Sequence, residues 1–291
     1  MTTPPSDLTL AAVAALWGAV TGALLPRAAY RFSVPPEEER DETTEEREET
    51  AGQEEQEEQE EQEAGGGWRA ICPAGHPMRG WLGRAPCRRC ADTGAPGAPR
   101  PSGVPGTPAE PVASGALLLP LLTALVCAAL AVATGVRPEL AVWLALAPVG
   151  VLLAVVDVRV RRLPDPLTLP LAVAALALLG LAALLPEHAG DWTTALLGAL
   201  ALGAGYLVLH LVNPGGMAFG DVKLALGMGA ALGWYGWPTV MLGTFAAFLF
   251  GALYGGVLFV VGRAGRGTLI AFGPFMLAGT LAGLLAGAYT A

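Results

Sequence analysis

Charged residues are scarce in this 291-residue chain, where they make up 14% of the sequence and lysine occurs once, at Lys223. Hydrophobic residues make up 53% of the chain, and its mean hydropathy is +0.51. A soluble domain of this length carries more charge and less apolar surface. The composition therefore excludes a soluble globular protein and predicts a polytopic membrane protein.

Cysteine and histidine are also rare, with four and three residues respectively. Cys127 lies inside an apolar run, whereas Cys72, Cys87 and Cys90 cluster in one polar segment. This distribution excludes the evenly spaced framework of a disulfide-stapled domain. We expect the polar segment to be reduced and cytosolic.

The net charge of -8 comes from one tract rather than from the chain as a whole. Residues 37–63 hold 16 of the 25 acidic residues against two arginines, which leaves the remainder of the chain with a charge of +6. Such a self-repelling, low-complexity tract cannot bury a core, so we expect it to be disordered. We expect no nucleic-acid partner.

Long apolar runs dominate the rest of the sequence. About 20 apolar residues are needed to cross a bilayer as a helix, and the chain offers about eight candidates. Glycines in the last two predict close packing between helices. The sequence thus predicts an all-α membrane bundle with about eight transmembrane helices, near residues 8–25, 112–134, 139–157, 167–185, 193–212, 222–236, 238–261 and 269–290.

The arginines indicate the topology. Arg159, Arg161 and Arg162 follow the third run, and Arg263 and Arg266 follow the seventh. Basic residues mark cytosolic loops, so both termini are predicted to lie outside. The predicted organisation is a first transmembrane helix at 1–26, a cytosolic loop at 27–111, and a seven-helix membrane domain at 112–291.

Two acidic residues at membrane boundaries are candidates for chemistry. Asp157 ends the third apolar run, and Asp221, 64 residues later, opens the sixth, which places both at the cytosolic face. Acidic residues in such positions are costly and are functional by default. Two neighbouring carboxylates cannot both ionise cheaply, so the pair can share a proton and act jointly as acid and base on a peptide bond.

Each acid also has a structural interpretation. Asp165 precedes Pro166 in the pattern of a helix N-cap, and we expect it to be structural. Asp157 could instead pair with Arg161 one turn later. Asp221 could simply complement a helix dipole, with Lys223 as a cytosolic anchor. The sixth run is short, however, so its start is predicted to lie below the membrane surface.

Three motifs carry a family resemblance: "DVRVRRLPD" from Asp157, "GGMAFGDVKL" from Gly215 and "IAFGPFMLAG" from Ile270. Together they resemble the type IV prepilin peptidases, which are membrane aspartic proteases of the GxGD class. The resemblance implies that Asp157 and Asp221 are catalytic. Ala218 stands where that pattern has its first glycine, which implies a negative φ at this position. The residues expected to support the site or bind substrate are Gly220, Lys223, Gly273 and Pro274.

The resemblance also implies an activity. A multi-pass protein of the bacterial inner membrane would cleave the basic leader of prepilin or pseudopilin substrates at the cytosolic face, with no cofactor needed for proteolysis. The lipid bilayer would be its other partner. Two alternatives from other classes are a proton-coupled transporter that uses intramembrane carboxylates and a non-catalytic scaffold.

The polar segment "CPAGHPMRGWLGRAPCRRC" could hold one structural zinc ion through Cys72, His76, Cys87 and Cys90. Gly75 stands where a partner of Cys72 would complete a first CxxC pair, so a segment that binds nothing is an equally open interpretation. The resemblance links this segment to N-methylation of the new pilin terminus with S-adenosylmethionine. The chain shows no glycine-rich nucleotide-binding pattern, and methylation therefore stays open.

Overall fold

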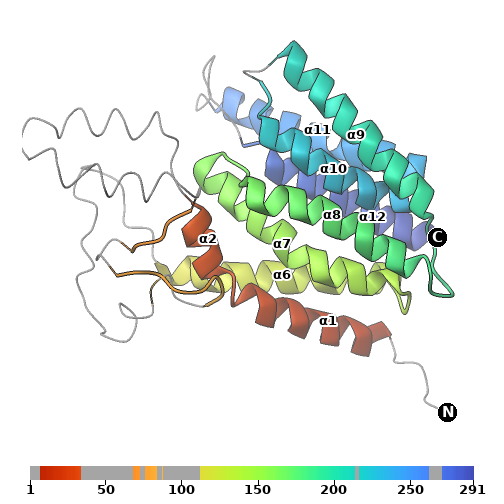
Figure 1. Ribbon diagram of the computed structural model, residues 1–291, viewed down its shortest axis with the longest axis horizontal. Coiled ribbons are helices and arrows are strands. Elements are labelled where there is room, and N and C mark those ends of the chain that lie inside the picture. The colour runs from red at the N-terminus through yellow and green to blue at the C-terminus, as the bar shows by residue number, and fades with distance from the viewer. Residues whose placement is uncertain are drawn as a thin grey trace, which may run out of the picture. The chain divides into compact units, whose positions relative to one another are not determined.

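The structure is a computed structural model, and it describes residues 7–33, 68–72, 76–83, 87, 112–213, 216–261 and 271–291. Within these ranges the chain forms helices and no strand, apart from an isolated bridge between Ile71 and Pro77. The predicted all-α fold is confirmed (Figure 1). The helices are α1 (Asp7–Gly22), α2 (Pro26–Phe32), α6 (Val112–Thr134), α7 (Glu139–Val160), α8 (Asp165–Ala182), α9 (Trp192–Val212), α10 (Phe219–Trp234), α11 (Trp237–Val260) and α12 (Gly273–Thr290).

Each of the eight predicted spans contains a helix, but the helices differ in length. Five of them, α6, α7, α8, α9 and α11, are long and apolar enough to cross a membrane. A sixth crossing results if α1 and α2, which meet at a bend of 47°, count as one broken span. The α10 helix has only 16 residues, so eight is an approximate number of crossings. The protein is a multi-pass helical membrane bundle.

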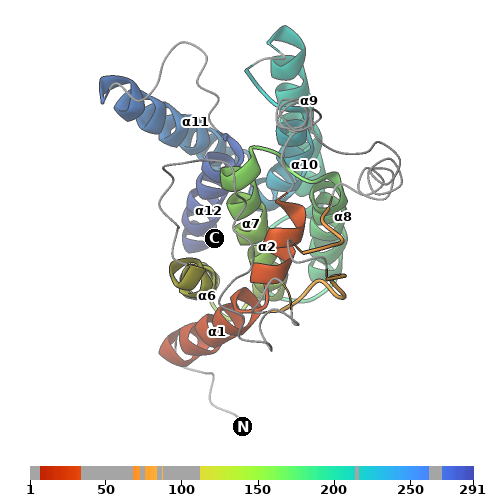
Figure 2. The same ribbon diagram turned by 90° about the vertical axis from the view of Figure 1, so that its left-hand side faces the viewer.

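The chain divides into two compact units, Met1–Gly22 with Pro120–Ala291, and Ala23–Leu119. In the first unit α10 is the central helix and packs against α8, α9, α11 and α12. Viewed along the bundle in Figure 2, α7, α10 and α12 lie between α8 and α9 on one side and α11 on the other. Twelve of the 16 residues of α10 are buried, among them Asp221.

Glycines allow the helices around α10 to touch backbone to backbone. A Cβ added at Gly229 would lie 2.2 Å from the carbonyl oxygen of Gly198 on α9. On α12, a Cβ at Gly279 would lie 2.5 Å from the carbonyl oxygen of Gly243 on α11. Such small-residue contacts are the usual means of close packing between membrane helices. The prediction of glycine-mediated packing in the last spans is therefore confirmed.

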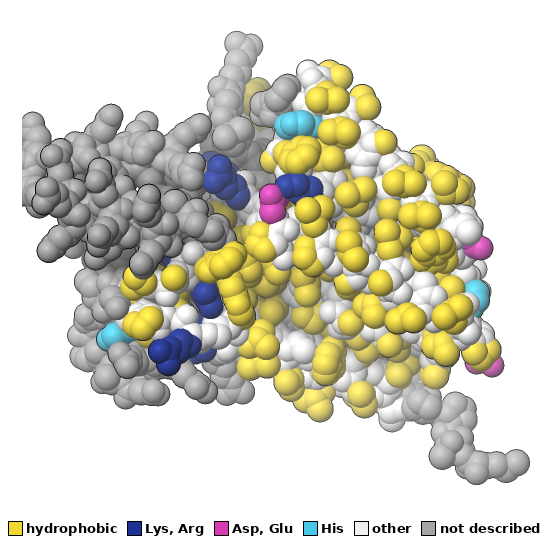
Figure 3. All heavy atoms as spheres, in the orientation of Figure 1, with side chains coloured by type: hydrophobic (Ala, Val, Ile, Leu, Met, Phe, Trp, Pro, Cys, Tyr) yellow, Lys and Arg dark blue, Asp and Glu magenta, His cyan; other side chains and the backbone are white. Residues whose placement is uncertain are grey.

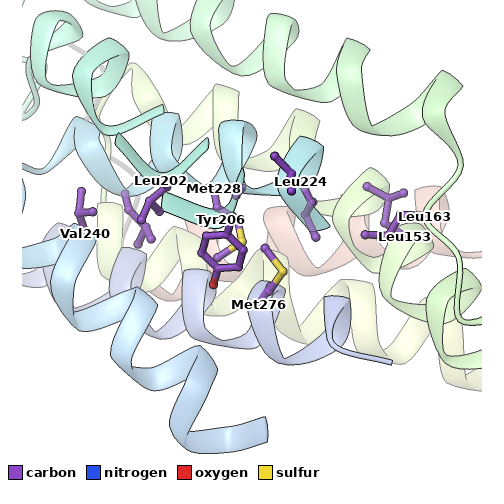
Figure 4. Close-up of a cluster of buried hydrophobic side chains, with 11 residues drawn as sticks. Leu153, Leu163, Leu202, Tyr206, Leu224, Met228, Val240 and Met276 are labelled. Carbon is purple, nitrogen blue, oxygen red and sulfur yellow. The ribbon is translucent and has the colours of Figure 1, made fainter. Parts of the chain in front are cut away.

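The outer surface of the first unit is apolar. Figure 3 shows hydrophobic side chains over most of the visible helical surface, with acidic, basic and histidine side chains toward its two ends. Only 11% of the apolar stretch of α11 is buried inside the protein, and the Phe245 side chain is 65% exposed. Because lipid tails solvate such side chains, this surface fits a bilayer rather than water. The interior holds a core cluster around Leu224, Met228 and Met276 (Figure 4).

The second unit joins α2 to the cysteine segment, whose described residues are 68–72, 76–83 and 87. Arg27 and Arg31, which follow the first apolar run, are both buried there. The Arg31 guanidinium donates to the carbonyl oxygens of Arg69 at 3.1 Å and Gly80 at 2.9 Å, and it lies 3.8 Å from the centre of the Trp81 ring. These arginines therefore hold a small folded unit together, a role that the sequence did not predict.

Candidate active site

Asp157 lies in the last turn of α7, with its side chain only 4% exposed. Its Oδ2 atom accepts a hydrogen bond from the backbone N–H of Gly273, the first residue of α12, at 2.9 Å. A Cβ at Gly273 would lie 2.6 Å from this oxygen, so the approach requires a glycine. The alternative in which Asp157 pairs with Arg161 is not observed. The one ion pair found among the described residues joins Asp165 to Lys223.

Asp221 is the third residue of α10 and is also 4% exposed. Its Oδ2 atom accepts from the backbone N–H of Ala218, the N-cap residue, at 3.2 Å. A carboxylate at this position satisfies a free N–H and complements the helix dipole. Ala218 has φ -73° and ψ 149°, which confirms the predicted negative φ. Alanine can therefore replace the first glycine of the motif without backbone strain.

The two carboxylates lie at one end of the bundle. The end of α7 and the starts of α10 and α12 meet there (Figure 1), and Asp157 and Asp221 interact electrostatically. Leu163 packs between the helix starts, because a Cβ at Gly220 would lie 3.0 Å from its Cβ and one at Gly273 would lie 3.5 Å from its Cδ1. In each carboxylate one oxygen is held by a backbone N–H. The other oxygen makes no hydrogen bond within the described residues.

Asp165 and Lys223 form the ion pair, with Asp165 Oδ2 2.6 Å from Lys223 Nζ. The predicted N-cap role of Asp165 is wrong, because α8 begins at Asp165 itself, and Pro164 before it is the cap residue. The pair joins the start of α8 to α10. Lys223 also lies 4.8 Å from the centre of the Phe219 ring, so its ammonium contacts neither candidate carboxylate in this arrangement. Pro274 occupies the first turn of α12, next to Gly273.

Tyr206 on α9 was missed by the sequence analysis. It is 2% exposed and interacts electrostatically with Asp221. Its ring lies 6.5 Å from that of Phe272, the residue before Gly273, and 5.9 Å from that of Phe248 on α11. A tyrosine in an otherwise apolar span is the signal that could have identified it, since a buried phenol hydroxyl ordinarily needs a partner.

The cysteine segment brings three predicted metal ligands together. His76 Nδ1 lies 3.7 Å from Cys72 Sγ and 3.9 Å from Cys87 Sγ, and all three ligand atoms lie within 4.8 Å of one another. Tetrahedral zinc, with bonds of roughly 2.0–2.3 Å, separates its ligand atoms by about 3.3–3.8 Å. The donor types are those that zinc prefers, and the two separations from His76 lie at or just above this range. Cys90, the fourth predicted ligand, lies outside the described residues.

Comparisons with known proteins place the two carboxylates in a family of peptidases. The model of the type IV leader peptidase family matches residues 140–256, a range that includes Asp157 and Asp221. The prepilin leader peptidase/N-methyltransferase of Aeromonas salmonicida is 36% identical over 176 residues, which are 57% of this chain and 56% of that protein. The protein of that name from Aeromonas hydrophila is 33% identical over 218 residues, or 71% of this chain and 64% of that protein.

A further relative, the prepilin leader peptidase/N-methyltransferase of Burkholderia pseudomallei, is 32% identical over 239 residues, covering 75% of this chain and 67% of that protein. The chain thus spans between about half and two thirds of the length of these relatives. No solved structure matches it. The family match and the extent of the Burkholderia match together show that the chain belongs to the type IV leader peptidase family.

Proposed function

We propose that this protein is a membrane aspartic endopeptidase that removes the basic leader of type IV prepilin-like proteins. The observation that carries the proposal is the meeting of two buried carboxylates, Asp157 and Asp221, at one end of a membrane bundle. They come from helices far apart in sequence, and each is oriented by one backbone N–H. Family membership supports peptidase chemistry at this pair. The transporter alternative has no support among the relatives.

The chemistry follows from a carboxylate pair that holds one proton. The ionised carboxylate accepts a proton from a water molecule, whose oxygen attacks the carbonyl carbon of the scissile bond. The protonated carboxyl gives its proton to the carbonyl oxygen. When the tetrahedral intermediate collapses, the C–N bond breaks, the leaving nitrogen takes the proton from the pair, and one hydroxyl of the intermediate returns a proton to the pair as the new C=O bond forms. Because two interacting carboxyls titrate jointly, we assign no separate acid and base roles to Asp157 and Asp221.

The orientation of the site belongs to the same proposal. Arg159, Arg161 and Arg162 lie within five residues after Asp157, and Lys223 lies two residues after Asp221. The excess of basic residues on cytosolic loops supports a site that faces the cytosol. A prepilin could then keep its charged leader in the cytosol while its apolar helix lies in the bilayer beside the bundle. The leader would be cut after a glycine just before that helix.

We propose a structural zinc ion for the second unit. Cys72, His76 and Cys87 would supply three ligands and Cys90 the fourth. Bound zinc would cross-link a segment that has little regular structure in its described part. Proteolysis by a carboxylate pair takes no step through this ion.

Methylation of the new terminus is a second proposed activity, supported by the names of the relatives, which include N-methyltransferase. S-adenosylmethionine would supply the methyl group to the amine that cleavage releases. Intact mass distinguishes the two activities, because methylation adds about 14 Da to the cleaved pilin.

The test of the proposed function is co-expression with a prepilin, followed by intact-mass analysis of the pilin from the membrane fraction. We expect a product that lacks the leader when the wild-type chain is present. Asp221→Asn, expressed at the same level, serves as the matched control and should leave the prepilin intact. A prepilin that stays uncut with the wild-type chain, tested across the prepilins of the same cell, would contradict the proposal.

A further inference from the structure

The Tyr206 hydroxyl is a buried polar group that has no hydrogen-bond partner among the described residues. The residue is 2% exposed, and its hydroxyl oxygen makes no hydrogen bond within the part of the chain that is described. Buried phenol hydroxyls are ordinarily hydrogen-bonded, and leaving one unpaired destabilises the fold. A retained but unpaired hydroxyl therefore suggests a partner that arrives from outside the chain.

The packing of α9 on α10 places Tyr206 beside the candidate active site. The two helices run antiparallel, with Gly198 against Gly229 near their middle and His210 Nδ1 2.8 Å from the carbonyl oxygen of Met217 at the site end. Between these two contacts, Tyr206 lies level with the first turn of α10. Its electrostatic interaction with Asp221 agrees with this register.

Aromatic contacts hold the ring in place. Phe248 stacks on Tyr206 with ring centres 5.9 Å apart, and Phe272 contacts both rings, at 6.5 Å from Tyr206 and 5.3 Å from Phe248. Figure 4 shows the Tyr206 ring among core side chains that include Met228 and Met276. Phe272 directly precedes Gly273, which binds Asp157. Phe272 therefore joins the Tyr206 ring to the backbone that orients Asp157.

Three of the hydrogen-bond donors near the pair are engaged within the described residues. The N–H groups of Gly273 and Ala218 bind the two carboxylates, and the Lys223 ammonium binds Asp165. Hydrolysis of a peptide bond builds negative charge on the carbonyl oxygen, and a preorganised donor at that oxygen lowers the barrier. A neutral phenol can supply such a donor in an apolar site without the desolvation penalty of a buried charge.

We propose that Tyr206 donates a hydrogen bond from its hydroxyl to the carbonyl oxygen of the scissile peptide bond. The inference rests on the proposed peptidase function and adds to it a third side chain that contacts the reacting atoms. Tyr206 stays protonated throughout, and the proton that reaches the carbonyl oxygen comes from the carboxylate pair.

The test compares Tyr206→Phe with the wild type, using purified full-length chain in detergent and a purified prepilin as substrate. We expect kcat to fall by about 10- to 100-fold while KM changes less than about twofold, because the lost contact forms mainly in the transition state. We also expect Tm to stay equal or rise, because the variant removes a buried hydroxyl that has no partner among the described residues.

Tyr235→Phe is the matched control. The Tyr235 hydroxyl accepts a hydrogen bond from Trp143 Nε1 at 3.2 Å, and the residue follows α10 at the end opposite Asp221. Its removal breaks a bond that exists within the protein, so Tm should fall while kcat stays within about twofold of the wild type. The two variants should thus show opposite effects on stability and on rate.

A kcat of Tyr206→Phe within twofold of the wild type would overturn the inference. So would a rise in KM alone, or a loss of rate that comes with a fall in Tm like that of Tyr235→Phe, since the hydroxyl would then be structural. If the wild-type chain itself cuts no prepilin, the peptidase proposal fails and this inference fails with it. Cleavage by the wild type with an unaffected Tyr206→Phe variant overturns only the role of Tyr206.

Discussion

At the scale of single residues, the candidate site depends on how closely backbone groups approach two carboxylates. Asp157 and Asp221 are each held by one N–H, and both N–H groups belong to residues at a helix start. Orientation by backbone groups is rigid, because it does not depend on side-chain rotamers. It also makes the site sensitive to a single added methyl group.

Gly273→Ala tests this sensitivity. The added Cβ would lie 2.6 Å from Asp157 Oδ2, a distance that real Cβ contacts do not reach, so the carboxylate must move. Displacement by about 1 Å can slow an enzyme by about 100-fold, and we expect cleavage of prepilin to fall by about 10- to 100-fold. The rate is measured with purified protein under single-turnover conditions.

Gly150→Ala on α7 is the control for Gly273→Ala. Its added Cβ would meet only Leu277 Cδ2, at an ordinary 3.7 Å, so the rate should stay close to that of the wild type. Wild-type cleavage by Gly273→Ala would show that the N–H contact does not orient Asp157.

Sequence alone identified the acidic residues but not all of their contacts. Asp165 before Pro166 has the local pattern of an N-cap, yet its partner is Lys223, which is 58 residues away in sequence. Tyr206 offers no pattern beyond a polar atom in an apolar run. Both assignments depend on which helices pack together and in which register, and a local pattern cannot supply that information.

At the scale of the helices, α10 positions Asp221 through its packing on α9. A Cβ at Gly229 would lie 2.2 Å from the Gly198 carbonyl oxygen and 2.7 Å from the Ala199 Cα. Because the obstacle is backbone rather than a flexible side chain, the helices must separate. The position of α10, and of Asp221 on it, relative to α9 therefore depends on the glycines of this interface.

We expect Gly229→Ala to lower the free energy of unfolding by about 1–3 kcal/mol, the usual effect of overpacking. Gly205→Ala, on the exposed face of α9, is the matched control, because its Cβ meets nothing within 4 Å. That variant should be unchanged or more stable by up to about 1 kcal/mol, since alanine favours a helix over glycine. Thermal unfolding in detergent measures both. Equal stability of the two variants would contradict the close contact between α9 and α10.

Helix existence was predictable, whereas helix ends and bends were not. Every predicted span contains a helix because a long apolar run in a bilayer must satisfy its own backbone hydrogen bonds. The first run was expected to reach residue 25, but α1 ends at Gly22 and the chain bends by 47° into α2. Arg27 and Arg31 explain α2, since they bind carbonyl groups of the cysteine segment that hydropathy does not register.

At the scale of the whole molecule, the chain combines a membrane bundle with a second unit that carries the cysteines. The predicted boundaries at residues 26 and 111 stay predictions, and so does the disorder of the acidic tract, which lies outside the described residues. The two compact units of the structure divide near residues 22 and 119. Their separate cores suggest that the chemistry of one unit can be tested without that of the other.

Measuring the zinc content of the purified protein tests the chemistry of the second unit by itself. We expect about one zinc per purified wild-type chain, and much less after Cys87→Ser, because a thiolate ligand is lost. Cys127→Ser is the control, since Cys127 belongs to the first unit, where it is buried on α6 in a cluster with Ala14 and Ala131, and its replacement should leave the zinc content unchanged. Elemental analysis after gel filtration provides the measurement. Zinc well below one per chain in the wild type would show that the cluster binds no metal.

The central claim, that two carboxylates act together on a peptide bond, is tested most directly by the intact mass of a prepilin co-expressed with Asp157→Asn, Asp221→Asn or Asp165→Asn. An amide keeps the shape of each carboxyl but cannot share a proton. The account predicts uncut prepilin with the first two variants and full loss of the leader with the third, which removes only a partly exposed ion pair. Substantial cleavage by either Asp157→Asn or Asp221→Asn, at wild-type expression and membrane insertion, would contradict it.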